Sequence, residues 1–162
     1  MPKEAIVAGV TIDPMTKSPI VVLKTKEGGE AVPIWIGILE ANAIALVLEG
    51  TDLPRPLTHD LLKAILEETG TRLEQVEITD IRDNTFFALL HLENSGRKWT
   101  MDSRPSDAIA VALRCGARIL VSEAVLAKSS IPASPETGSE ERDKWMELLE
   151  KMDPEQFSKY KM

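Results

Sequence analysis

The sequence predicts an α+β fold: a mixed β-sheet packed by helices in a single compact domain, with a C-terminal helical tail. The order of the elements is the first reason. Three strand patterns are followed by two helix patterns, further strands, and then a helix, a strand and a helix. Composition is the second reason, because 43% hydrophobic and 28% charged residues over 162 positions suffice to bury one core. We expect residues 1–130 to form the domain. Residues 131–162 should form a Pro/Ser linker and an amphipathic helix that packs back on it.

The first half of the chain predicts a small sheet followed by two helices. Apolar residues in strand patterns place strands at residues 5–13, 20–24 and 31–36. Gly28-Gly29 marks a hairpin loop between the second and third strands, and Pro33 indicates a sheet edge or a bulge. Gly37 ends the third strand, and one helix follows directly while a second begins near Thr58. The second helix has a stripe that we expect to be buried, made of Leu61, Leu62, Ile65 and Leu66.

The second half returns to strands before it ends in helices. Strand patterns cover residues 75–79, 85–92 and 97–101, and a short buried strand is expected at residues 119–121. Helices are expected over residues 105–115 and 123–128. In the tail, a further helix is predicted by the helical spacing of Trp145, Leu148, Leu149 and Met152.

A strand-to-helix corner precedes the most apolar helix of the chain. Pro105 lacks an N–H group and therefore suits the first helical turn, where Asp107 also interacts favourably with the helix dipole. Residues 108–113 include no polar side chain, so we expect this helix to be buried on all sides. Asp102, Arg104 and Asp107 should therefore lie at the start of the most buried helix.

Charge and cysteine content exclude several classes of protein. The net charge of −7 argues against a broad electrostatic surface for nucleic acid. The single Cys115 excludes an intramolecular disulfide and a cysteine-based zinc cluster. No apolar run reaches the roughly 20 residues that span a bilayer, and the N-terminus does not resemble a signal peptide. We therefore expect a cytoplasmic protein without a membrane partner.

Two segments of the chain echo each other. Residues 55–60 (Arg-Pro-Leu-Thr-His-Asp) and 104–107 (Arg-Pro-Ser-Asp) both read Arg-Pro, a hydroxyl residue and Asp before an apolar helix. Each could simply be a favourable helix start. Alternatively, the two helix N-termini converge into an anion site, since helix N-termini favour anions and arginine binds phosphate bidentately. That site would contain Arg55, His59, Asp60, Arg104 and Asp107.

Three motifs in this order resemble the bifunctional nuclease domain family, formerly a domain of unknown function. They are Pro33-Ile34-Trp35-Ile36-Gly37 with Glu40-Ala41, the segment at residues 55–61, and the segment at residues 102–110. The resemblance covers roughly residues 5–128. It implies a compact α+β domain that is often dimeric, with DNase and RNase activity.

A nuclease of this kind would use the charged residues of these motifs. Phosphodiester hydrolysis commonly employs one or two Mg²⁺ or Mn²⁺ ions held by carboxylates. The candidate metal ligands are Glu40, Asp102 and Asp107. The candidate catalytic residues are His59, Asp60, Asp102 and Asp107, with His59 as general base or acid. The candidate substrate-binding residues are Arg55, Arg104 and Ser106.

The same residues also fit structural roles. Glu40 and Asp60 could serve merely as helix caps. Arg104 and Asp107 could form an ion pair between elements, and His59 could be a solvated residue in the first turn of a helix. The competing function is therefore a non-catalytic, dimeric binding or regulatory module that recognises a small anionic ligand. Spatial convergence of the carboxylates at an open cleft would favour the nuclease. In either case we expect a homodimer or larger homo-oligomer. Because the protein is acidic, DNA or RNA should be a weakly bound substrate.

Overall fold

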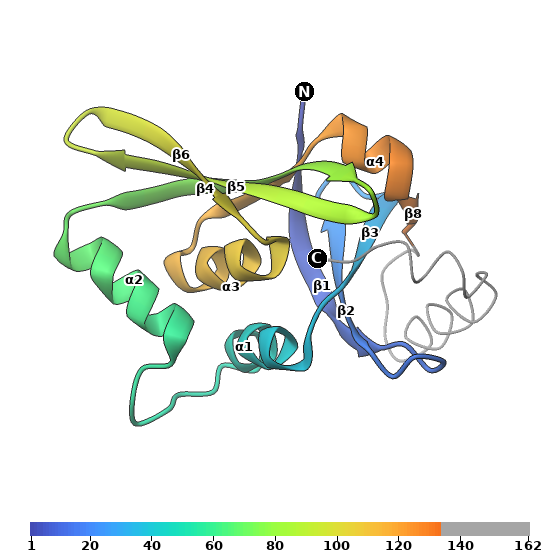
Figure 1. Ribbon diagram of the computed structural model, residues 1–162, viewed down its shortest axis with the longest axis horizontal. Helices are drawn as coiled ribbons and strands as arrows, with labels where there is room; N and C mark the ends of the chain where they lie inside the picture. The colour runs from blue at the N-terminus through green and yellow to red at the C-terminus, as the bar shows by residue number, and fades with distance from the viewer. Residues whose placement is uncertain (134–162) are drawn as a thin grey trace.

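A mixed sheet lies at the centre of the protein (Figure 1). The computed structural model describes residues 1–133. Within them the strand order is β6-β5-β4-β7-β1-β2-β3-β8. The strands are β1 (Lys3–Ile12), β2 (Pro19–Thr25), β3 (Glu30–Trp35), β4 (Arg72–Arg82), β5 (Thr85–Asn94), β6 (Arg97–Ser103), β7 (Arg118–Val121) and β8 (Ile131–Pro132).

The sheet consists of two antiparallel meanders joined by β7. Strands β1 to β3 form one meander and β4 to β6 the other. Strand β7 runs parallel to β4 and antiparallel to β1, which makes the sheet mixed, as the sequence predicts. Pro33 pairs with Val22 on one side only, because β8 pairs with β3 at Glu30 and Ala31 alone. A proline without an N–H group is tolerated at such an edge.

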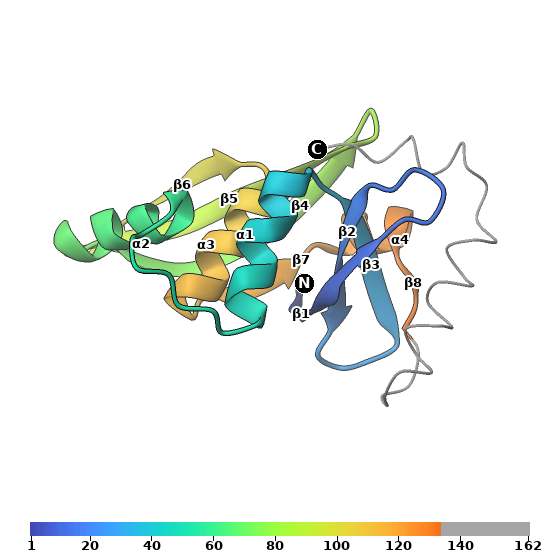
Figure 2. The same cartoon turned by 90° about the horizontal axis from the view of Figure 1, so that it is seen from below.

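Four helices of residues 1–133 pack on the sheet. They are α1 (Ile38–Leu48), α2 (Thr58–Glu68), α3 (Pro105–Cys115) and α4 (Glu123–Ser129). Figures 1 and 2 show α1, α2 and α3 side by side, with α3 between the other two, while α4 lies apart from them and contacts β3 and β4. Helix α3 packs against both α1 and α2 and against β4 and β5. The position of α3 therefore sets the positions of its two neighbours.

Helix α3 is buried along most of its length, as its apolar sequence predicts. Every residue from Ala108 to Ala112 is at most 3% exposed. Pro105 occupies the first turn, and Gly116 ends the helix in the left-handed conformation at φ +66°. Burying five consecutive residues in this way requires neighbours on every side, and α1, α2 and the sheet provide them.

The expectation for α2 was wrong in one respect, because no residue of this helix is fully buried. Its predicted buried stripe remains about half exposed: Leu61 is 52%, Leu62 42% and Ile65 49% exposed, and only Leu66 packs against the core. The reason is position. Helix α2 lies at the end of the helical layer and contacts α3 and β4, and no other helix of residues 1–133 lies on its outer side (Figure 1).

Other sequence expectations lie partly outside the described residues. The tail helix around Trp145 belongs to residues 134–162, which are not described. Strand β8 falls in the segment that was expected to be a linker, and Ala133 continues its contact by donating to the Gly29 carbonyl at 3.1 Å. Within residues 1–133, no helix has the length and apolar character that crossing a membrane requires.

Candidate functional site

Three helix starts meet through four charged or polar side chains, which we call the Arg104 network. His59 at the start of α2 shares a hydrogen bond with Asp107 of α3, with Nε2 and Oδ1 2.9 Å apart. Arg104 donates from Nε to Asp107 Oδ2 at 2.8 Å and from Nη1 to Glu40 Oε1 of α1 at 3.0 Å. The network is therefore continuous, in the order Glu40, Arg104, Asp107, His59.

The local sequence explains how Arg104 and Asp107 come together. Arg104 is the N-cap residue of α3, with extended backbone angles (φ −70°, ψ 145°), and Pro105 fixes the next φ for the first turn. Residues three apart at a helix start lie on the same side, so Asp107 faces back towards Arg104. The pair therefore forms within a single turn of chain and presents its outer groups to α1 and α2.

Gly37 allows the Glu40 carboxylate to take its place in this network. Glu40 folds back over the start of α1, so that a Cβ atom at Gly37 would clash with its carboxylate. The backbone of Gly37 is extended (φ −76°, ψ 163°), a conformation open to any residue. Gly37 therefore matters because it has no side chain, which leaves room for the Glu40 carboxylate, and not because its backbone is flexible.

The network lies at the surface, with its histidine the least exposed member. The side chain of His59 is 12% exposed, that of Asp107 31% and that of Arg104 53%. Burial raises the pKa of the Asp107 carboxyl, but hydrogen bonds from Arg104 and His59 outweigh burial and the net pKa is lowered. Hydrogen bonding to Asp107 raises the pKa of Arg104 in turn. Asp107 is therefore an anion at neutral pH.

Asp60 belongs to a second, separate cluster. It accepts from the Leu57 backbone N–H at 2.9 Å, which caps α2, and from Arg114 Nε at 2.7 Å. Both contacts lower the pKa of its carboxyl, the backbone hydrogen bond most. Asp60 thus occupies the capping position that the sequence offered as the alternative to catalysis.

Arg114 is the residue that sequence reasoning missed. Its side chain is 5% exposed and reaches all three helices: Asp60 of α2, the Ala110 carbonyl of α3 at 2.9 Å and the Ala43 carbonyl of α1 at 3.0 Å. From the sequence alone it is only a basic residue in the last turn of a helix. The available signal was its position directly after an apolar run, since a charge next to buried residues requires partners.

The structure keeps three other candidates apart from the Arg104 network. Asp102 is exposed in β6, where Trp99 packs against the core. Strand alternation therefore turns Asp102 to the opposite face of the sheet. Arg55 is exposed in the linker before α2 and forms no ion pair with the described residues. Ser106 is 1% exposed, and its Oγ has no hydrogen-bond partner within residues 1–133.

The proposed metal ligands are not assembled as a set. Within the described part of the chain, no three His, Cys, Asp or Glu side chains come together in a way that could hold a metal ion. Glu40 and Asp107 both bind the Arg104 guanidinium, so a cation there would have to displace an arginine. The arrangement does not fit a carboxylate-held metal, and metal dependence stays a prediction.

Comparison with known proteins identifies the family of this chain. Residues 21–134 match the family model of the bifunctional nuclease domain, so this chain belongs to that family. This confirms the resemblance expected from the three motifs.

Individual relatives extend the match. A protein of Mycobacterium tuberculosis, described as uncharacterized, is 37% identical over 162 residues, covering 95% of this chain and 97% of its own. Bifunctional nuclease 1 of Oryza sativa subsp. japonica is 28% identical over 125 residues, covering 74% of this chain and 38% of its own. Bifunctional nuclease 2 of Arabidopsis thaliana is 29% identical over 107 residues, covering 64% of this chain and 32% of its own.

The Arg104 network predicts a specific dependence of stability on pH. Because the folded-state pKa of Asp107 is lowered, its stabilising contribution is present above the unfolded value, near 3.9, and is lost as pH falls through the folded value. Asp107→Asn should therefore lower the free energy of unfolding by about 1–3 kcal/mol at pH 7 and by progressively less below about pH 4. Urea unfolding at several pH values measures this difference.

Asp102→Asn is the matched control, because this carboxylate lies on the opposite face and should change stability little at any pH. A difference between wild type and Asp107→Asn that persists undiminished at pH 3 would contradict the assigned contacts.

Proposed function

We propose that the protein hydrolyses phosphodiester bonds of DNA and RNA, and that the Arg104 network is its active site. Membership of the bifunctional nuclease domain family supports a nucleic-acid substrate. The observation that carries the choice of site is the hydrogen bond between His59 and Asp107, which joins two helices at a partly exposed position.

Each member of the network has a chemical role in this proposal. Asp107 orients the His59 ring, so the imidazole can take a proton from the attacking water or give one to the leaving oxygen. Arg104 has donors beyond those used for Asp107 and Glu40, and these can bind a phosphate oxygen. Two carboxylates beside one arginine offset its attraction for phosphate, so substrate affinity should be low.

Assistance by Mg²⁺ or Mn²⁺ is kept as a separate proposal with its own test. No step above requires an ion, because proton transfer and phosphate binding are assigned to side chains of this chain. Comparing cleavage with Mg²⁺, with Mn²⁺ and with chelator decides whether an ion takes part.

The alternative function is a binding module for a small anionic ligand. It is supported by the fact that Asp60 and Asp107 each pair with a different arginine, Arg114 and Arg104, and do not face one another across a shared site. However, the side chains of these two carboxylates are 39% and 31% exposed, so neither pair is sealed in the interior. Partial exposure leaves Asp107, to which His59 is bonded, accessible to a substrate, which is why we favour the nuclease.

We also propose that the protein self-associates through the exposed apolar side of α2. Leu57, Leu61, Leu62 and Ile65 are 40–52% exposed on this one segment. A contiguous apolar patch of this kind commonly marks an interface, and an isologous contact places the same patch on both subunits. A second copy is therefore the occupant that we assign to it.

The nuclease proposal predicts the effect of one histidine substitution. His59→Ala should reduce cleavage of single-stranded DNA and RNA by about 100-fold or more, because it removes the proton-transferring group. The measurement is a time course on labelled oligonucleotides, with Mg²⁺, Mn²⁺ or chelator and after a folding check by circular dichroism. His91→Ala is the matched control, since the chain has two histidines and His91 lies in β5 beside Glu77, outside the Arg104 network.

Retention of cleavage in His59→Ala would remove the network from the chemistry and indicate a contaminating nuclease. The binding module would then be the preferred function.

The assembly proposal predicts a change in mass. The full-length protein should have a mass of at least twice 17.9 kDa by light scattering at micromolar concentration. Ile65→Glu should shift it to monomer, because a charge would be buried at the contact. A monomeric wild type would refute the proposal, and so would a dimer that is unaffected by Ile65→Glu.

A further inference from the structure

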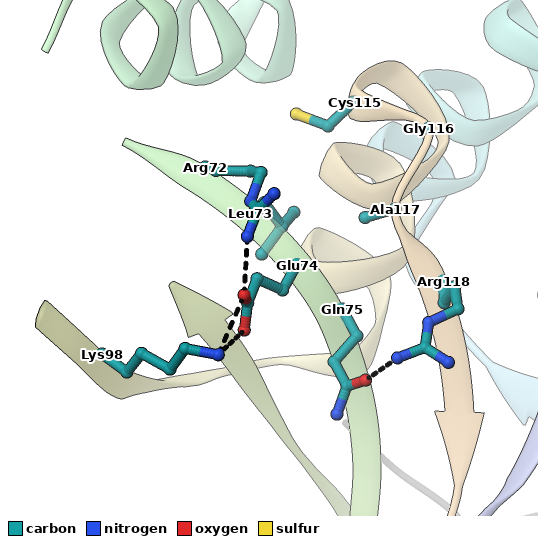
Figure 3. A pocket seen from close by; sticks show the side chains of 9 residues that line it. All are labelled: Arg72, Leu73, Glu74, Gln75, Lys98, Cys115, Gly116, Ala117 and Arg118. Carbon is teal, nitrogen blue, oxygen red and sulfur yellow. Dashed lines mark hydrogen bonds and ion pairs between the residues drawn. The ribbon is translucent and has the colours of Figure 1, made fainter. Parts of the chain in front are cut away.

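A cationic hollow lies at the opposite end of α3 from the Arg104 network (Figure 3). It has a volume of about 550 Å³ and opens to solvent, and three of its lining residues are Arg72, Lys98 and Arg118. Cys115 and Gly116, the last residue of α3 and the residue after it, line the same hollow. Since Cys115 follows Asp107 by eight residues in α3, the hollow lies about 12 Å from Asp107 along the helix.

The strand register places these cations in a row. Lys98 of β6 pairs with Glu93 of β5, Glu93 pairs with Arg72 of β4, and Arg118 of β7 pairs with Gln75 of β4. The row therefore crosses four adjacent strands, which spans about 14 Å at the usual strand spacing. Its length suits an extended charged chain better than a single ion.

Positive charge exceeds negative charge in this hollow. Arg72 and Lys98 share the Glu74 carboxylate, at 2.9 Å and 3.2 Å (Figure 3). Arg118 donates to a neutral group, the Gln75 side-chain oxygen, at 2.8 Å. The lining contains three cations and one carboxylate, and Glu93 beside it pairs with Arg72 at 3.7 Å, which leaves an excess of one positive charge on a chain whose net charge is −7. Such a local excess is where an acidic protein can hold an anion.

The donors at this site are side chains. The backbone N–H groups of Gly116 and Ala117 both bond to the Ala112 carbonyl and are not available to a ligand. Arginine and lysine side chains are the groups that bind phosphate oxygens, arginine bidentately.

We propose that this hollow binds phosphate groups of a nucleic-acid strand whose cleavage takes place at the Arg104 network. The inference rests on the proposed function for its ligand. It adds a second contact, at the far end of α3, that compensates for the low phosphate affinity of the network itself. Phosphate contacts of this kind fix the position of a strand without reading its sequence.

The test measures binding separately from cleavage. Every sample carries His59→Ala in the full-length chain, so that the labelled single-stranded DNA is not consumed, and anisotropy is recorded over a range of salt concentrations. Arg118→Gln and Lys98→Gln should each weaken binding about threefold to tenfold and make the salt dependence shallower by about one counterion. Arg118→Lys keeps the charge and should retain most of the salt dependence.

Lys17→Gln is the matched control, because it removes one positive charge in the turn between β1 and β2, on the other half of the sheet. Orthophosphate and adenosine monophosphate, added as competitors, distinguish a site for any phosphate from one that needs a chain. If orthophosphate, adenosine monophosphate and the unlabelled oligonucleotide compete at similar concentrations, the hollow is a site for any phosphate and not for a strand. A large advantage of the oligonucleotide would assign a strand site.

Equal binding and equal salt dependence in the His59→Ala parent and in its Arg118→Gln and Lys98→Gln derivatives would overturn the proposal. So would a parent that binds none of the three ligands. Failure of the nuclease proposal gives a different result. Wild type would not cleave, while the parent would still bind DNA in an Arg118-dependent way.

Discussion

The ion pair between Arg104 and Asp107 is the interaction on which the site depends. Each partner has a second contact on a different helix, Glu40 of α1 for Arg104 and His59 of α2 for Asp107. One pair at the start of α3 therefore orients groups from two other helices. Exposed ion pairs contribute little to stability by themselves. The value of this pair lies in positioning His59, which is the least exposed member of the set.

Helix α3 makes this arrangement possible because it is buried between α1, α2 and the sheet. Its apolar residues fix it in place, and arginines near its two ends bind the neighbouring helices. Arg104 acts at the N-terminal end, while Arg114 reaches Asp60 and the Ala43 carbonyl from the last turn. The helices on this face are thus joined by charged contacts at both ends and by apolar packing between them. The same contacts use up much of the positive charge near His59, which leaves the hollow lined by Arg118 as a separate source of phosphate affinity.

The sequence predicted the fold class well, because strand and helix periodicities were strong and α3 had an unbroken apolar run. It also paired the starts of α2 and α3 through their shared Arg-Pro pattern, and the structure brings His59 to Asp107. It failed for the partners of Arg114: the apolar run before this residue indicates a charge that needs partners, but those partners come from other elements and cannot be named from the local sequence. It also failed for the exposed stripe of α2, because amphipathic spacing does not say whether a neighbour is present to cover it.

The most direct test of the central claim is a double-mutant cycle between His59 and Asp107. Free energies of unfolding are measured by urea at pH 7 for wild type, His59→Ala, Asp107→Asn and the double variant. Residues joined in one hydrogen-bonded network are coupled, so the two single effects should exceed the double effect by about 1 kcal/mol. Single effects that add, to within about 0.3 kcal/mol, would show that the two side chains act independently, and would contradict the network as the organising feature of the site.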